Sequence, residues 1–378
     1  MEVTPWTVSG KVDYDKLISQ FGCSPITPDI LQHLEAATGH QPHHWLRRGL
    51  FFAHREFDQI IEHHAQHRPL YLYTGRGPSS SGLHLGHLVP FVFSKWLQDV
   101  FGAQLVIQLT DDEKFLWKDL TLDQAHHYAR ENAKDIIALG FDPKKTFIFS
   151  DLDYMGHMYP LCLSIQKMVT TSQAKGIFGF TDSDCIGKIS FPAVQAAPSF
   201  PQCFPHLFGG RKDIRCLIPC AIDQDPYFRM TRDIAPRLGY NKPSLVYSKF
   251  FPTLQGNETK MSASTQNSAI FLTDTATQIK TMINRYAFSG GESTVALQHK
   301  NGANLAVDVA YQYLRFFLED DAELERLKID YSSGKMLTGD VKSILISALT
   351  KLVLDHQIAR AKVTEEIVDQ FMCNKQVY

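Results

Sequence analysis

Short β-rich runs alternate with helical patterns from about Pro69 onward, and this alternation predicts a parallel sheet with crossover helices. The runs show no regular exchange of apolar and polar positions, which is typical of strands buried on both faces. The predicted strands span residues 70–74, 104–110, 146–150, 216–222 and 245–247. We therefore predict an α/β fold: a Rossmann-type parallel sheet with helices on both faces.

One of the crossover helices carries clear signals at both ends. Thr121 and Gln124 have the spacing of a capping box, in which each side chain bonds the other residue's backbone. Gly140 can end the helix after the apolar residues at 133–139. These signals predict at least one β-helix-β unit.

The two ends of the chain have a different pattern. After about Thr275 the strand signal fades, and apolar residues recur at helical spacing in 307–318, 341–354 and 363–371. The first 66 residues look helical and polar, with a basic and aromatic stretch at 42–49. We predict a helical N-terminal extension over 1–66, a Rossmann domain over 67–274 and an all-helical domain over 275–378.

The composition changes this picture only by what it excludes. A formal net charge of −2 over 378 residues excludes a protein that holds nucleic acid by a general excess of positive charge. An RNA partner must therefore meet local basic patches, and no DNA partner is expected. The start lacks a secretory signal, and no run approaches the roughly 20 apolar residues of a membrane span. Seven scattered cysteines suit a reducing compartment, so we expect a soluble intracellular protein. Cys216 and Cys220 have no second pair at zinc spacing and are interpreted as buried thiols, not as metal ligands.

A turn rich in glycine and serine, residues 74–87, connects the first strand to a predicted helix over 88–101. Backbone N–H groups and the helix dipole can hold phosphate oxygens at such a turn, although an ordinary crossover turn has the same composition. His84 and His87 lie one helical turn apart, so two imidazoles can donate to a phosphate. Gly86 between them leaves bare backbone against which an adenine ring can lie. The turn is a candidate nucleotide site.

A second candidate lies in a polar loop after the last predicted strand, at residues 260–264, Lys-Met-Ser-Ala-Ser. A lysine on a mobile loop can move onto the β- and γ-phosphates of ATP as charge develops on departing pyrophosphate. Alone, this segment would be interpreted as an exposed loop. The segment becomes informative because it follows the histidine motif in the chain.

The two motifs together, His-Leu-Gly-His at 84–87 and Lys-Met-Ser-Ala-Ser at 260–264, resemble the two signatures of class I aminoacyl-tRNA synthetases. Over nearly its whole length the chain is similar to the eukaryotic cytosolic tryptophanyl-tRNA synthetases, most clearly at residues 71–80, 110–114, 179–184 and 221–229. Two features depart from that family. The appended N-terminal helix-hairpin domain of many animal members is not in this sequence, and residues 155–164 are shorter than the family pattern, so local dimer contacts are not carried over.

The resemblance implies a binding site for tryptophan. An indole offers a flat apolar surface and one N–H donor, so its pocket should supply apolar walls and one or two acceptors. Tyr73 and Gln108 match the family positions that meet the indole nitrogen, and both lie near the carboxyl ends of adjacent predicted strands, where α/β sheets bind ligands. Glu113, Gln195 and Gln224 match the positions that receive the ammonium group.

The resemblance also implies which residues act on ATP. His84, His87 and Lys260 are the implied catalytic residues, because they would act on the phosphates. The other implied ATP-binding residues are Arg76, Gly86, Met261, Ser262 and Ser264. The implied activity is ligation of L-tryptophan to the 2′-hydroxyl of the terminal adenosine of tRNA(Trp), with ATP and Mg²⁺. The resemblance also implies a cytoplasmic homodimer, and no membrane partner is expected. The helical domain would read the anticodon, but Arg285, Tyr286 and Phe288 fit a helix core equally well, so no site is assigned there.

Three other interpretations remain open at this point. A tyrosyl synthetase of the same fold would need a carboxylate for the phenol where the resemblance places Gln108. A catalytically silent RNA-binding or signalling protein would not need His84, His87 and Lys260 intact. A metalloenzyme is suggested by the histidines at 63–67 and 126–127, but acidic partners at catalytic zinc spacing are missing. We therefore expect no metal site in the protein itself.

Overall fold

The computed structural model describes residues 2–3, 8–9, 12–260 and 267–373, and its centre is a seven-stranded sheet of order β3-β4-β9-β8-β5-β6-β7. The run from β9 to β7 is parallel, whereas β4 pairs antiparallel with β9 and with β3. The strands are β3 Ser24–Pro25, β4 Phe51–Arg55, β5 Leu70–Arg76, β6 Gln104–Leu109, β7 Thr146–Ser150, β8 Arg215–Ala221 and β9 Ser244–Ser248. The predicted α/β class and all five predicted strands are confirmed.

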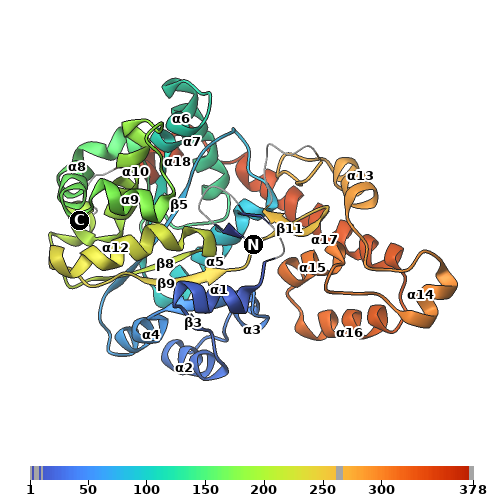
Figure 1. Ribbon diagram of the computed structural model, residues 1–378. Coiled ribbons are helices and arrows are strands. Elements are labelled where there is room, and N and C mark those ends of the chain that lie inside the picture. The colour runs from blue at the N-terminus through green and yellow to red at the C-terminus, as the bar shows by residue number, and fades with distance from the viewer. Residues whose placement is uncertain (1, 4–7, 10–11, 261–266, 374–378) are drawn as a thin grey trace.

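Helices cover both faces of this sheet (Figure 1). One face packs against α2 Pro28–Thr38, α4 Phe57–Ala65, α5 Leu85–Phe101 and α7 Leu122–Ile137. The other packs against α1 Tyr14–Phe21, α8 Asp151–Met168, α9 Thr171–Phe178, α10 Ile186–Ala196 and α12 Asp225–Leu238. Short helices lie between these elements: α3 His44–Arg47, α6 Asp111–Trp117 and α11 Pro205–Phe208. Two small antiparallel pairs complete the strands: β1 Glu2–Val3 with β2 Val8–Ser9, and β10 Pro252–Thr253 with β11 Gly256–Lys260.

The central strands are buried on both faces, as their composition predicts. On β5, Leu70 and Leu72 belong to the hydrophobic cluster on one face, while Tyr71 and Tyr73 belong to the cluster on the other. Successive side chains of a strand point to opposite sides, so both sets must be large and mostly apolar. The capping box of α7 also forms: the backbone N–H of Gln124 donates to Thr121 Oγ1 at 3.2 Å and that of Thr121 to Gln124 Oε1 at 2.9 Å.

The N-terminal region departs from its prediction in one respect. It contains the helices α1 to α4, but it also contributes β3 and β4, and these two antiparallel strands widen the sheet beyond β9. The first three residues of β4 are buried and apolar. His54, which follows them, is also buried, and its Nδ1 is satisfied by the backbone N–H of Phe57 at 3.0 Å. This region is therefore part of the sheet as well as an extension of it.

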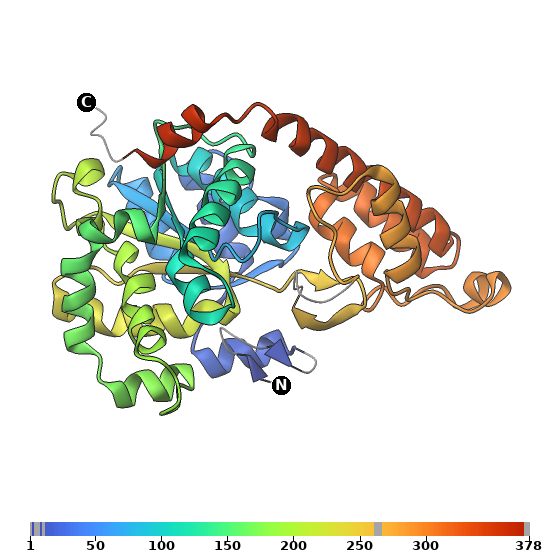
Figure 2. The same cartoon turned by 90° about the horizontal axis from the view of Figure 1, so that it is seen from above.

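The C-terminal region is helical, as predicted, with α13 Ala276–Tyr286, α14 Val295–Asn301, α15 Val309–Phe317, α16 Asp321–Ser332, α17 Thr338–Arg360 and α18 Glu365–Met372. Figure 2 shows α17, in red, running from the other C-terminal helices back toward the sheet, where α18 packs against α7 and β7. None of the described helices is long and apolar enough to cross a bilayer.

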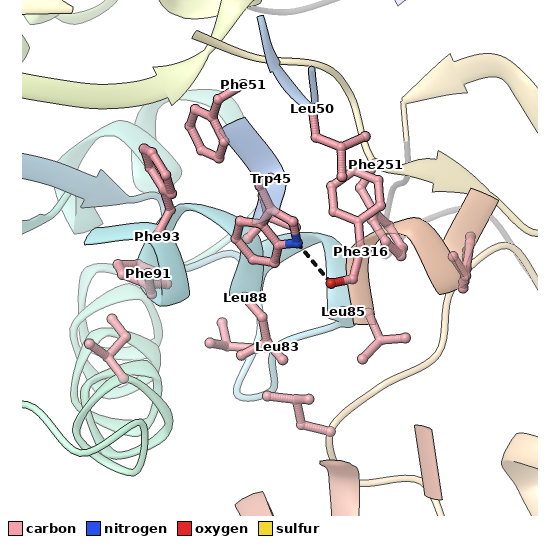
Figure 3. Close-up of a cluster of buried hydrophobic side chains, with 14 of the residues drawn as sticks. Trp45, Leu50, Phe51, Leu83, Leu85, Leu88, Phe91, Phe93, Phe251 and Phe316 are labelled. Atoms are coloured by element: carbon pink, nitrogen blue, oxygen red, sulfur yellow. Dashed lines mark hydrogen bonds between the residues drawn. The ribbon is translucent and has the colours of Figure 1, made fainter. Parts of the chain in front are cut away.

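A continuous core joins the N-terminal region to the C-terminal helices (Figure 3). The indole N–H of Trp45 donates to the carbonyl oxygen of Phe316 at 2.7 Å. The Phe51 ring stacks on Phe93 with centroids 3.7 Å apart, and the Phe251 ring lies 5.0 Å from Phe316. The hydrophobic cluster that contains Trp45 and Phe51 therefore extends without a break from the sheet to α15.

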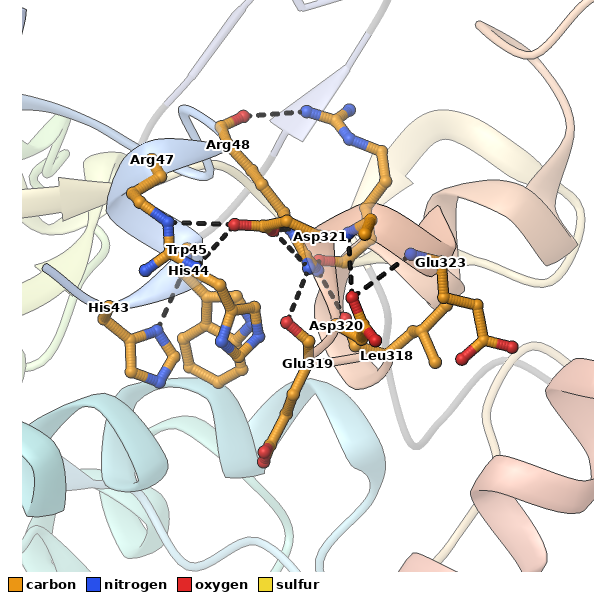
Figure 4. A network of polar contacts seen from close by, with 12 residues as sticks. His43, His44, Trp45, Arg47, Arg48, Leu318, Glu319, Asp320, Asp321 and Glu323 are labelled. Carbon is orange, nitrogen blue, oxygen red and sulfur yellow. Dashed lines mark hydrogen bonds and ion pairs between the residues drawn. The ribbon is translucent and has the colours of Figure 1, made fainter. Parts of the chain in front are cut away.

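Polar contacts at the same junction fix how α15 ends (Figure 4). The Arg48 guanidinium donates to the carbonyl oxygens of Arg315 at 2.8 Å and Leu318 at 2.6 Å, and its Nε donates to Asp321 at 2.7 Å. A cation at the C-terminal end of a helix satisfies carbonyls that have no partner in the helix and is favoured by the helix dipole. The basic stretch at 42–49 is therefore a junction between parts of the fold.

Candidate active site

A cavity of about 290 Å³ opens at the carboxyl ends of β5, β6 and β8, beside the start of α5. This is the end of a parallel sheet at which α/β folds bind ligands. Its walls include every predicted site residue whose side chain the structure describes: Tyr73, Arg76, His84, Gly86, His87, Gln108, Glu113, Gln195 and Gln224. The sequence placed these residues on different elements, and the fold brings them to one cavity.

The histidines form one end of the cavity. His84 is the residue before α5 and is buried, and the His87 ring stacks against it with centroids 3.4 Å apart. The backbone N–H of His84 donates to His87 Nδ1 at 3.3 Å, which fixes the second ring. Gly86 lies between them in the first turn of a 17-residue helix, whose N-terminus attracts anions through its dipole. This end suits phosphate groups.

Arg76, the last residue of β5, adds a cation to the same end. Its Nε donates to Asn132 Oδ1 of α7 at 3.2 Å, and Asn132 donates to the Ser80 carbonyl at 2.7 Å, so α7 orients the guanidinium. Burial lowers the pKa of Arg76 to about 10, against the opposing effect of the Glu113 and Asp135 charges, so the group stays cationic at neutral pH. Its Nη2 is buried and finds no hydrogen-bond partner among the described residues, which suits an incoming anion.

Lys114 is a cavity residue that the sequence analysis missed. Its Nζ lies 2.8 Å from Glu113 Oε1, and both side chains are mostly buried against Gly77. The residue is part of the stretch 110–114 that carried the resemblance, but only Glu113 was given a role. A lysine next to an acidic residue at a strand end looks like a surface ion pair in the sequence, because nothing local shows that the turn after β5 will cover it.

The other end of the cavity holds the predicted amino-acid site. The Tyr73 hydroxyl lies 2.5 Å from Gln108 Oε1 and 2.9 Å from the carbonyl oxygen of Gln195, so it can donate to either. Gln108 Nε2 donates to Asp151 Oδ1 at 2.8 Å and to the Val194 carbonyl at 3.3 Å. Both side chains are almost fully buried. This end offers oxygen acceptors inside apolar walls that include Ile218, Tyr227, Phe228 and Phe250.

The three residues predicted to receive an ammonium group also line the cavity. Glu113 Oε2 accepts from the Thr110 hydroxyl at 2.8 Å, which holds the carboxylate toward the sheet. Gln195 of α10 donates from Nε2 to Oε1 of Gln224, the residue before α12, at 3.0 Å. Carboxylate and amide oxygens from three different elements therefore face one volume, which suits a primary ammonium donor.

The lysine motif is described only in part. Lys260 is the last residue of β11, and its backbone pairs with Pro252, which follows the cavity residues Phe250 and Phe251. Met261, Ser262 and Ser264 lie outside the described residues.

Beyond them, the chain returns to the histidine motif: the backbone N–H of Leu85 donates to the Ile270 carbonyl at 3.0 Å, and that of Leu272 to the Leu83 carbonyl at 2.9 Å. The described residues on either side of 261–266 therefore pair with segments that adjoin the cavity residues Phe251, His84 and Gly86.

The described part of the chain holds no group of three or more His, Cys, Asp or Glu side chains arranged for a metal ion. Cys216 and Cys220 are free, buried thiols on β8. His63 bonds the Pro69 carbonyl at 3.0 Å.

Comparison with known proteins gives a consistent result. Residues 65–353 match the family model of class I tRNA synthetases (W and Y). The chain is 63% identical over 377 residues to the cytoplasmic tryptophan–tRNA ligase of Homo sapiens, in a match that spans 98% of this chain and 80% of that relative.

Solved structures are similar along the whole chain. The tryptophanyl-tRNA synthetase from Giardia lamblia has a TM-score of 0.93 at 46% identity and covers 97% of each chain. The tryptophanyl-tRNA synthetase from Encephalitozoon cuniculi, solved bound to tryptophan, has a TM-score of 0.90 at 42% identity and covers 97% of this chain and 99% of that one. Identity at this level accompanies the same arrangement of helices and strands.

Proposed function

The chain belongs to the class I tRNA synthetases of tryptophan and tyrosine and is a tryptophan–tRNA ligase, and from this premise we propose how the cavity at the strand ends performs the reaction. One observation carries the proposal. The Tyr73–Gln108 pair, which contacts α10, and the group formed by His84, His87 and Arg76, which lies at α5 and α7, line a single cavity. An amino acid at one end and a triphosphate at the other would meet between them.

In the first step, a carboxylate oxygen of tryptophan attacks the α-phosphorus of ATP. The P–O bond to the β-phosphate breaks, pyrophosphate leaves, and tryptophanyl adenylate remains. No protein nucleophile is needed, since positioning and charge stabilisation supply the rate. His84, His87, Arg76 and Lys260 stabilise the phosphates, and Lys260 acts most strongly as negative charge moves onto the leaving group.

ATP enters as a substrate, and Gly86, Met261, Ser262 and Ser264 are assigned to its binding. Mg²⁺ neutralises charge on the triphosphate and aligns its oxygens when it is bound. The described residues offer no cage of carboxylates for the ion. Mg²⁺ would enter with ATP, whose phosphate oxygens are among its preferred ligands.

In the second step, the 2′-hydroxyl of the terminal adenosine of tRNA(Trp) attacks the acyl carbon, and AMP leaves. The helical region over 275–378 is then the part that reads the anticodon, since unstacked RNA bases are bound by aromatic and Arg groups. Named relatives are cytoplasmic enzymes, and we assign this chain to the same compartment.

Tryptophan is preferred over tyrosine because of the chemistry at the far end of the cavity. An indole N–H needs an acceptor, which Gln108 Oε1 and the Tyr73 oxygen supply. A phenol hydroxyl is both a donor and an acceptor, and it would need a carboxylate at the position where this chain has the amide of Gln108. Tyrosine would also leave part of the volume unfilled, at a cost of about 1–3 kcal/mol.

We also propose that two copies of this chain form a homodimer through α8. Leu152, Tyr159 and Leu163 project from one side of that helix, with 40%, 53% and 46% of their surfaces exposed. Exposed large apolar residues in a stripe indicate a surface that is covered by a partner. An α8–α8 contact related by a two-fold axis would pair the stripe with itself.

The experiment that tests the catalytic proposal is tryptophan-dependent ATP–pyrophosphate exchange with Lys260→Ala. Because Lys260 is assigned to the leaving group, kcat is expected to fall by about a hundredfold or more, while KM for tryptophan changes by less than about threefold. Lys328→Ala is the matched control, since Lys328 is exposed on α16 and pairs with Glu325. Equal losses in kcat and in tryptophan affinity would contradict the proposed role of Lys260.

A further inference from the structure

A pair of carboxyl groups lies behind the amino-acid end of the cavity. Asp151, the first residue of α8, is fully buried, and its Oδ1 accepts from Gln108 Nε2 at 2.8 Å. The carboxyl group of Asp112 on α6 lies close enough to interact with that of Asp151. Neither group touches the reacting atoms in the scheme above, so the pair has no role in the chemistry itself.

Two carboxyl groups can hydrogen-bond to each other only if one of them carries a proton. Burial and the charge of Asp112 raise the pKa of Asp151 well above its ordinary value. The second oxygen of Asp151, Oδ2, receives no hydrogen bond from the described residues, which leaves it free to hold that proton. The third acid nearby, Asp111, has its own donors in the Ser150 hydroxyl and the Leu152 backbone N–H.

Asp151 and the Val194 carbonyl determine which way the Gln108 amide points. Its Nε2 faces two acceptors, Asp151 Oδ1 and the Val194 carbonyl, and its Oε1 faces the Tyr73 hydroxyl. A flipped amide would place Oε1 against both acceptors and Nε2 at the position where the indole N–H must be received. That arrangement would leave buried polar groups unpaired, so the acceptors hold the oxygen toward the cavity.

The same hydrogen bonds connect the two ends of the amino-acid site. Asp112 Oδ1 accepts from the backbone N–H of Glu113 at 2.7 Å, next to the carboxylate assigned to the ammonium group. On the opposite side, the Tyr73 hydroxyl reaches the Gln195 carbonyl, and Gln195 donates to Gln224. These contacts therefore link the residues assigned to the ammonium group with the Tyr73–Gln108 pair.

We propose that Asp151 is a positioning residue for tryptophan selection: as the protonated partner of Asp112, it holds Gln108 with its amide oxygen toward the indole N–H. This inference rests on the proposed assignment of Gln108 to the indole nitrogen. It requires a hydrogen-bonding group at position 151 that accepts from Gln108 and donates to Asp112. A neutral amide satisfies both needs as well as a protonated acid does.

The test compares Asp151→Leu, which removes both bonds, with Asp151→Asn, which preserves both. Pyrophosphate exchange is measured with tryptophan and with an analogue that has sulfur in place of the indole N–H. Asp151→Leu is expected to raise KM for tryptophan about tenfold, with KM for the analogue and for ATP changed less than about threefold. Asp151→Asn is expected to stay within about threefold of the wild type. Asp308→Asn, a buried aspartate of the helical region that accepts from Tyr331, controls for a general loss of stability.

Two results would overturn the proposal: equal loss of tryptophan and analogue in Asp151→Leu, or a defect in Asp151→Asn as large as that in Asp151→Leu. If Asp151→Leu does not fold, infrared spectra decide the matter. The wild type should show a carboxylic-acid carbonyl band at neutral pH that is missing from Asp151→Asn, and its absence from the wild type would refute the shared proton. Failure of the wild type to exchange with tryptophan would instead refute the proposed function.

Discussion

Asp151 is a buried side chain whose proposed effect on tryptophan binding acts through its neighbour Gln108. Gln108 was identifiable from the sequence because it lies at the end of a predicted strand and matches a family position. Asp151 was not, because an aspartate after a strand and before a helix is an ordinary helix start. Its contact with a residue 43 positions earlier follows from the parallel pairing of β6 with β7.

The protonation of Asp151 predicts a pH dependence of stability. In the unfolded chain an aspartate ionises near pH 3.8, whereas in the folded protein the pKa of Asp151 is raised well above that value by burial and by Asp112. Above about pH 4 the folded state therefore holds more protons than the unfolded state, and stability falls as the pH rises toward neutral. Asp151→Asn removes this loss, because the amide never ionises.

Urea unfolding of the wild type and Asp151→Asn between pH 4 and 7 measures the effect. The variant is expected to gain stability relative to the wild type as the pH rises, by at most about 1.4 kcal/mol per pH unit. Asp111 and Asp112 face the same region, and because Asp112 interacts with Asp151, the comparison reports on this pair of carboxyl groups. A constant difference, or one that shrinks with rising pH, would show that Asp151 is ionised in the folded state.

The residues that line the candidate site were more predictable from the sequence than the residues that hold them in place. The described site residues that the sequence indicated all line the cavity; some were marked by strand ends and a helix start, and Glu113, Gln195 and Gln224 by the family resemblance. The residues that hold them, such as Asn132 behind Arg76 and Thr110 beside Glu113, have contacts that depend on packing between elements. Such partners leave no spacing signal in a single sequence.

At the scale of elements, the central strands were predictable because burial on both faces produces continuous apolar runs. β4 was missed for the opposite reason: its apolar stretch is short and continues into His54 and Arg55 within a region rich in charged residues. Its burial depends on β9, nearly 200 residues later, and no local pattern can indicate that pairing.

The exposed stripe on α8 gives a prediction about assembly. Leu163→Glu would place a charge in the proposed dimer contact, where it would be buried without a partner, so the variant is expected to sediment as a monomer. The wild type is expected to sediment as a dimer of 42.8 kDa chains. Leu354→Glu is the control, because Leu354 is 53% exposed on α17 and lies outside the stripe.

Analytical ultracentrifugation with circular dichroism separates loss of assembly from loss of folding. A folded Leu163→Glu protein that still sediments as the dimer would exclude α8 as the contact. A monomeric wild type at micromolar concentration would exclude the dimer itself.

At the scale of the whole molecule, the predicted division at about residue 275 agrees with a helix that begins at Ala276 and is capped by Thr275. The division stays a prediction, because other contacts cross it. Arg48 and Trp45 tie the N-terminal region to α15, and α18 packs on α7 and β7. Through these contacts, the parts that would bind tryptophan and tRNA share one core.

The central claim is that one cavity selects tryptophan through an indole acceptor at one end and activates it with ATP at the other. The most direct measurement is ATP–pyrophosphate exchange by the purified chain with tryptophan and with tyrosine in parallel. The account predicts exchange with tryptophan and a kcat/KM for tyrosine lower by about a hundredfold or more. Comparable exchange with tyrosine, or exchange with neither amino acid, would contradict it.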